Sequence, residues 1–134
     1  MILVDTDVLI ASLRGVEAAR DWLRGARSRT GRLAVSVVTN AEILGGMRSP
    51  ERREVNRLLN SLRPLPVTDM IAHRAEQLRR RYRRSHGAIS LIDYLIAATA
   101  EVHGLELVTL NTKHFPMFDG IEPPFTVGAR PARG

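Results

Sequence analysis

Cysteine is absent from this 134-residue chain, which excludes disulfides, thiolate metal sites and thiol nucleophiles. No apolar run approaches the roughly 18 residues that a membrane-spanning helix needs. The N-terminus also lacks the basic start and long apolar stretch of a signal peptide, because Met1 leads straight into a short apolar segment. These absences agree with a reducing compartment, so we expect a cytoplasmic protein without membrane contact.

Lysine is nearly absent as well. Of the 20 basic residues all but Lys113 are arginine, and the formal net charge is +6. Positive charge favours a polyanionic partner, and the planar guanidinium group of arginine binds phosphate bidentately. The bias therefore suits a nucleic-acid substrate. Codon bias explains it equally well, since alanine and glycine are also abundant.

The order of apolar segments predicts one α/β domain over residues 1–127. Short runs rich in Ile, Leu and Val are typical of strands buried on both faces. The runs lie at 1–4, 33–38 and 105–110. Helical spacing alternates with them, at 16–28, 40–47, 50–62, 69–84 and 91–102. This alternation implies a parallel sheet with right-handed crossovers.

Prolines and the C-terminal segment complete this prediction. Pro64 and Pro66 are expected to end the helix before them. Residues 111–119 should form a turn with one helical turn. Residues 121–127 are expected to form a last edge strand, although their two prolines weaken that prediction. Residues 128–134 form a polar tail that we expect to be disordered.

Acidic residues stand where the predicted strands end. Asp5 and Asp7 directly follow the first strand, at the edge where open α/β sheets bind ligands. Two such carboxylates repel each other unless a cation neutralises them. Glu42 follows the second strand, and Asp93 lies early in the most apolar helix. If Asp5, Glu42 and Asp93 converge, they form an all-oxygen site suited to Mg²⁺ or Mn²⁺.

Each acid also has a purely structural interpretation. Thr39-x-x-Glu42 and Ser90-x-x-Asp93 both fit the capping box, in which the acid accepts a hydrogen bond from the amide of the cap residue. Asp5 could cap the first helix. The metal-site interpretation therefore rests on the three acids taken together, and on the cost of burying an unpaired carboxylate.

Four segments, in order, resemble a known family. MILVDTDVLI, VVTNAEILGG, LIDYLIAATA and LVTLNTKHF are similar to the motifs of PIN-domain nucleases, specifically the VapC-like toxins of toxin–antitoxin modules. The resemblance covers residues 1–118. It implies a three-layer α/β/α sandwich around a mainly parallel sheet. It also implies a divalent-metal-dependent ribonuclease that hydrolyses phosphodiester bonds in RNA.

The resemblance assigns roles by position. Asp5, Glu42 and Asp93 match the catalytic and metal-binding acids, with Mg²⁺ or Mn²⁺ as the cofactor. Asn111 stands where many relatives carry a fourth acid, and its neutral amide leaves open whether a second metal binds.

Four further residues surround this acidic set. Thr6 and Thr109 match small polar residues near the family's site, and Asp7 is expected to support the metal ligands. His114 occupies a position where relatives often carry Asp, which leaves its role open.

The resemblance further implies a cognate antitoxin, an RNA substrate and a homodimer. A run of arginines ends the helix predicted at 69–84, and Arg79, Arg80 and Arg83 are candidates for RNA binding. A solvated helix end, favoured by the helix dipole, or an antitoxin-binding surface explains the same run.

Other functions fit parts of the sequence. A housekeeping RNA-processing PIN nuclease and a catalytically silent PIN-like binding module share the same motifs. Haloacid-dehalogenase-like phosphatases also carry two Asp residues after a strand, usually followed by Gly-Thr. Here Val8 and Leu9 follow instead, and Lys113 is the only lysine.

Overall fold

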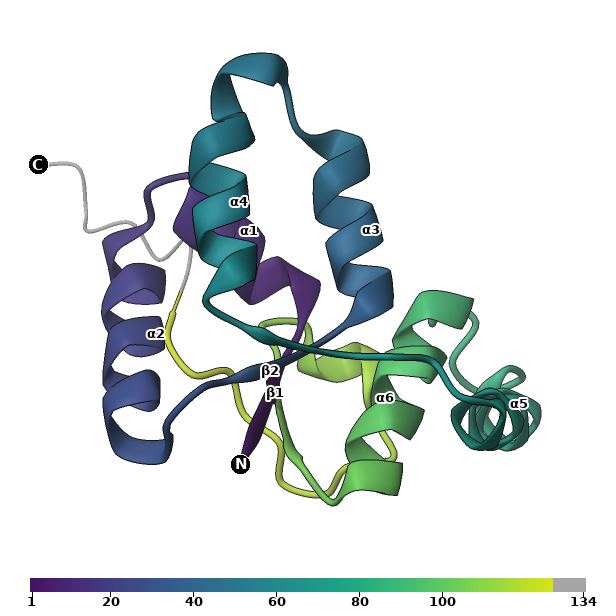
Figure 1. The fold of residues 1–134 in the computed structure, drawn as a ribbon. Coiled ribbons are helices and arrows are strands. Elements are labelled where there is room, and N and C mark those ends of the chain that lie inside the picture. Colours follow the sequence, from purple (N-terminus) through teal and green to yellow (C-terminus); the bar gives the residue numbers. More distant parts are fainter. Residues whose placement is uncertain (127–134) are drawn as a thin grey trace, which may run out of the picture.

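Four short strands form one sheet at the centre of the computed structural model, which describes residues 1–126 (Figure 1). They are β1 (Ile2–Val4), β2 (Ala34–Ser36), β3 (Arg63–Leu65) and β4 (Glu106–Val108). Their order is β3-β2-β1-β4, and each neighbouring pair is parallel. The predicted parallel sheet is therefore confirmed, and the carboxyl ends of all four strands lie at one edge.

Helices cover both faces of this sheet (Figure 1). Side chains of β1 alternate between the faces, because Leu3 packs into one core cluster while Ile2 and Val4 pack into the other. The first cluster includes α5 and α6, and the second includes α1 to α4. The predicted three-layer α/β/α sandwich is confirmed. The helices are α1 (Thr6–Leu13), α2 (Glu17–Thr30), α3 (Val37–Gly46), α4 (Arg52–Asn60), α5 (Asp69–Tyr82) and α6 (Leu91–His103), with 3-10 turns η1 (Ser49–Glu51) and η2 (Thr112–His114).

The fourth strand is not where the sequence predicted it. Residues 63–65 form β3, although Pro64 lies at its centre. Proline is tolerated because β3 is an edge strand that pairs only with β2, so one side of its backbone needs no partner. Residues 121–126, expected to begin an edge strand, contain no strand. Residue 127 and the predicted tail at 128–134 lie outside the described residues.

The boundary between β2 and α3 also differs from the prediction. The strand was expected to continue to Val38, but α3 already begins at Val37. Ser36 ends the strand, because its hydroxyl accepts a hydrogen bond from the amide of Val38 at 3.2 Å and caps the helix. Thr68 caps α5, and the predicted cap at Ser90 is confirmed for α6. Within residues 1–126, the structure has no helix of the length and apolarity that a membrane crossing requires.

Candidate active site

Asp5 lies at the carboxyl end of the central strand and caps α1. Its Oδ1 accepts a hydrogen bond from the amide of Thr6 at 2.8 Å, and its Oδ2 accepts one from the hydroxyl of Thr109 at 2.8 Å. Only 5% of the residue is exposed. Burial, followed by the negative charge of Asp7, raises the pKa of Asp5 to about 7, and the two hydrogen bonds oppose this rise. A cation at Asp5 would therefore relieve an unfavourable charge.

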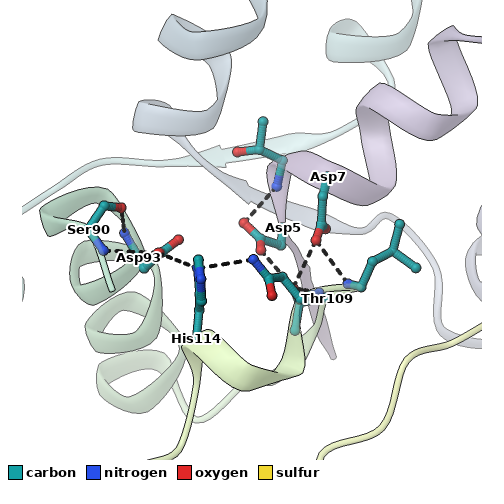
Figure 2. Close-up of polar contacts among 9 residues, drawn as sticks. Asp5, Asp7, Ser90, Asp93, Thr109 and His114 are labelled. Atoms are coloured by element: carbon teal, nitrogen blue, oxygen red, sulfur yellow. Dashed lines mark hydrogen bonds and ion pairs between the residues drawn. The ribbon is translucent and has the colours of Figure 1, made fainter. Parts of the chain in front are cut away.

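The hydroxyl of Thr109, which directly follows β4, contacts both Asp5 and Asp7 (Figure 2). Asp7 Oδ2 accepts hydrogen bonds from the amide of Leu110 at 3.1 Å and from the hydroxyl of Thr109 at 3.2 Å. Thr109 is fully buried, and its oxygen accepts a hydrogen bond from the amide of Asn111 at 3.0 Å. Burial also raises the pKa of Asp7. These contacts place Thr109 against Asp5 and Asp7, and the supporting role of Asp7 and Thr109 stays a prediction.

Glu42 reaches the same region from α3. Its Oε1 accepts a hydrogen bond from the hydroxyl of Thr6 at 2.8 Å, and Thr6 Oγ1 also lies 2.9 Å from Thr39 Oγ1. The predicted capping box between Thr39 and Glu42 is wrong, because Ser36 caps this helix three residues earlier. Glu42 therefore lies in the second turn of α3, where its side chain is free to reach the start of α1. The fully buried Thr39 belongs to this network, and the sequence prediction missed it.

Asp93 closes the site from the start of α6. The predicted capping box is confirmed, because Asp93 Oδ2 accepts from the amide of Ser90 at 3.1 Å while Ser90 Oγ accepts from the amide of Asp93 at 3.2 Å. The same Oδ2 lies 3.0 Å from His114 Nδ1, and that nitrogen lies 3.0 Å from Asn111 Nδ2 (Figure 2). The capping role leaves Oδ1 of Asp93 available for another ligand.

Contacts thus connect the predicted acidic and small polar site residues in two chains, which do not include Arg79, Arg80 and Arg83. One chain runs from Asp5 and Asp7 through Thr109 to Asn111, His114 and Asp93, and the other runs from Asp5 through Thr6 to Glu42. The charge of Asp93 also contributes to the raised pKa of Asp5.

The donors fit a hard divalent cation, since they are carboxylate oxygens and none of Asp5, Asp7 and Glu42 forms an ion pair with a basic side chain in residues 1–126. In this arrangement no three acidic or histidine side chains of residues 1–126 lie close enough to share one ion. Mg²⁺ does not require three, because it keeps several waters and binds through one or two carboxylates plus substrate phosphate. The shared site of Asp5, Glu42 and Asp93 stays a prediction.

The arginines at the end of α5 are exposed but not equivalent. Arg80 pairs with Glu76 one turn earlier, which reduces its free charge. Arg79 has no such ion pair among the described residues, and its charge lowers the pKa of Tyr94, which burial raises. Arg79 therefore lies near Tyr94 of α6.

A family match covers nearly the whole described chain. Residues 2–120 match the model of the PIN domain. The chain belongs to the PIN-domain family.

Named relatives within this family are similar over the full length. The chain is 64% identical to "Ribonuclease VapC10" of Mycobacterium tuberculosis (strain ATCC 25618 / H37Rv) over 132 residues, which cover 98% of each protein. It is 38% identical to "Ribonuclease VapC19" of the same strain over 125 residues, 93% of this chain and 100% of that relative.

Solved structures agree with this placement. A toxin–antitoxin complex from Klebsiella pneumoniae matches with a TM-score of 0.78 and 28% identity, covering 95% of this chain and 100% of that one. The structure of DNA-bound VapBC from Salmonella typhimurium matches with a TM-score of 0.74 and 26% identity, covering 91% of this chain and 95% of that one.

Proposed function

We propose that this chain is a divalent-metal-dependent ribonuclease and the toxin of a toxin–antitoxin module. The observation that carries the nuclease proposal is the buried Asp5. The negative charges of Asp7 and Asp93 both raise its pKa, and it has no basic partner in the described residues. The toxin proposal is supported by 64% identity to a protein named Ribonuclease VapC10, and by similarity to a chain of a toxin–antitoxin complex.

Asp5, Asp93 and Glu42 are the residues that would hold the metal. The chemistry that Mg²⁺ or Mn²⁺ would supply there is a lowered pKa of a bound water molecule and neutralised charge on the scissile phosphate. Asp5 or Asp93 would orient or deprotonate the attacking water. Thr109 and the amide of Thr6 fix the two oxygens of Asp5, so its orientation does not have to be established when substrate binds.

RNA is the substrate we propose, bound as a single-stranded segment whose bases are accessible. The exposed arginines at the end of α5, Arg79, Arg80 and Arg83, would contact its phosphates. Since the pairing with Glu76 reduces the free charge of Arg80, we expect Arg79 to contribute more than Arg80. The 2′-hydroxyl is not needed as nucleophile, so selection of RNA would come from binding.

The partner we propose is an antitoxin whose amphipathic segment lies along the helices next to the site. A groove between α1, α3 and α4 has an apolar floor that includes Ile10, Leu13 and Met47. Glu42 and Glu54 are among the polar residues that line it. Glu54 is already paired with Arg20, so an arginine on the bound segment would pair with Glu42 and exclude metal or substrate. We also propose a homodimer, and the cytoplasm as the place where toxin, antitoxin and RNA meet.

Two measurements test this function. Purified protein should cleave single-stranded RNA with Mg²⁺ and lose the activity with a chelator or with Asp5→Ala. Asp21→Ala should cleave normally, because that exposed side chain on α2 pairs with Arg24 and not with a residue of the site. Induction of the chain alone should arrest growth, and co-expression of the neighbouring antitoxin gene should restore it.

The outcomes separate the alternatives. Cleavage without growth arrest would favour a housekeeping RNA-processing nuclease over a toxin. Absence of both metal binding and cleavage in the folded protein would favour a catalytically silent binding module.

A further inference from the structure

His114 is a side chain of the polar network to which neither the capping pattern nor the acidic set gives a role. It belongs to η2, directly after β4, and it contacts an acid on α6 that lies 21 residues earlier (Figure 2). We propose that His114 is a positioning residue for Asp93: it donates its Nδ1 hydrogen to Oδ2 and so leaves Oδ1 to bind the divalent cation. This inference rests on the proposed function.

The two oxygens of Asp93 differ in their surroundings. Oδ2 lies within hydrogen-bond distance of both the Ser90 amide, at 3.1 Å, and His114 Nδ1, at 3.0 Å. Oδ1 has no hydrogen-bond partner recorded in residues 1–126. With one oxygen held by donors from two directions, the carboxylate cannot rotate freely, and the other oxygen keeps a fixed direction. Outer partners of this kind orient metal-binding carboxylates in many proteins.

The backbone around His114 is itself fixed. Its amide donates to the carbonyl of Asn111 at 3.0 Å, and the amide of Phe115 donates to the carbonyl of Thr112 at 3.0 Å. The ring of Phe115 is fully buried in the core against α6. The imidazole is 28% exposed and the Asp93 side chain 16%, so water competes only partly for their contact. A side chain anchored in this way can hold its partner in one orientation.

The proton positions follow from the partners of Nδ1. An ionised carboxylate has no hydrogen to give, so the hydrogen in the contact with Asp93 must be on Nδ1. Nδ1 then cannot accept from the Asn111 amide nitrogen, which lies 3.0 Å away. Exchanging the nitrogen and oxygen of that amide, which have nearly the same shape, removes the conflict. Its NH₂ group then faces away from His114. The neutral imidazole is sufficient for this role.

Asparagine and glutamine substitutions separate this role from a general effect of the ring. The amide nitrogen of asparagine can take the place of Nδ1, whereas that of glutamine corresponds to Nε2. His73→Gln is the matched control, because His73 also lies beside an acid, Asp69 at 3.4 Å, but on the exposed surface of α5. Calorimetric titration of the purified full chain with MnCl₂, without RNA, measures metal affinity directly. Thermal unfolding in chelator verifies the fold.

We expect His114→Gln to weaken Mn²⁺ binding by roughly tenfold or more, the usual effect of losing such an outer partner. His114→Asn should retain affinity within roughly threefold, and His73→Gln should not change it. The Mn²⁺ concentration needed for half-maximal RNA cleavage should shift in the same order. If His114→Gln does not fold, His114→Leu, which removes the donor but keeps apolar bulk, replaces it with the same expectation.

Three results would overturn the proposal. The first is wild-type affinity for Mn²⁺ in His114→Gln, and the second is an equal loss in His114→Asn and His114→Gln. The third is a loss of RNA cleavage at unchanged Mn²⁺ affinity, which would make His114 a substrate contact. Failure of the wild-type chain to bind Mn²⁺ would refute the metal-dependent function as well, so the two failures are distinguishable.

Discussion

Asp5→Asn should stabilise the metal-free protein at both pH 5 and pH 8, and the gain should be larger at pH 8. The pKa of Asp5 is raised from 3.8 to about 7 in the folded protein, so the folded state retains a proton that the unfolded chain releases. The stability supplied by this proton is complete below pH 3.8 and is lost as the pH rises through about 7. At about 1.4 kcal/mol for each pKa unit, the loss between pH 5 and pH 8 is roughly 3 kcal/mol.

Asparagine fits this position without a new defect. It is among the best N-cap residues, and its oxygen can accept from the Thr6 amide as Asp5 Oδ1 does. Its NH₂ can donate to Thr109 Oγ1, and the hydroxyl of Thr109 can then donate to Asp7 alone. The variant therefore removes the ionisation of Asp5 while the number of satisfied hydrogen bonds stays the same.

Urea unfolding in chelator at pH 5 and pH 8 measures this effect as a free-energy difference. The difference between wild type and Asp5→Asn cancels the contributions of titrating groups that do not interact with Asp5. Asp7 is not among these groups, because its negative charge raises the pKa of Asp5 and the interaction is mutual, so the measured difference belongs to the pair. Asp21→Asn is the control, because that side chain is 73% exposed. Saturating Mg²⁺ should stabilise the wild type more at pH 8 than at pH 5. An equal difference between wild type and Asp5→Asn at the two pH values would refute the argument from burial.

Further predictions concern the other parts of the site. Asp93→Asn should keep the fold and gain some thermal stability without metal, because carboxylate repulsion is relieved. It should lose RNA cleavage by roughly a hundredfold or more, and full activity would contradict the assignment of Asp93 as a metal ligand. Arg79→Gln should raise KM for RNA and reduce its salt dependence, with a smaller change for Arg80→Gln, and equal effects would argue against the role of Glu76. Ser36→Ala should lower the free energy of unfolding by about 1 kcal/mol through loss of the α3 cap, as measured by urea unfolding.

The layers of the fold could be predicted because buried strands and amphipathic helices differ in their hydrophobic period. The prediction missed β3, because a Pro-Leu-Pro sequence was interpreted only as the end of a helix. Whether Pro64 interrupts a strand depends on which of its sides has a neighbour. That information lies in the strand order, which local sequence does not contain.

The sequence predicts candidate residues for the site but not the connections between them. Asp5, Glu42 and Asp93 were selected because three acids at strand ends or a helix start suggested a shared cation, and their metal-binding role stays a prediction. The role of Ser36 as cap was missed, since Thr39 and Glu42 satisfy the capping pattern equally well. The contact between His114 and Asp93 was also missed, because nothing in either segment indicates that η2 lies beside the start of α6.

The contact between Asp5 and Thr109 joins residues 104 positions apart. During synthesis Asp5 leaves the ribosome long before Thr109 is made. Until then β1 cannot pair with β4, its neighbour on one side of the sheet. A growing chain therefore carries Asp5 and Asp7 before it has Thr109, whose hydroxyl contacts both. The chain order itself delays assembly of the site until almost all of the protein has been made, close to the moment at which a partner protein can bind it.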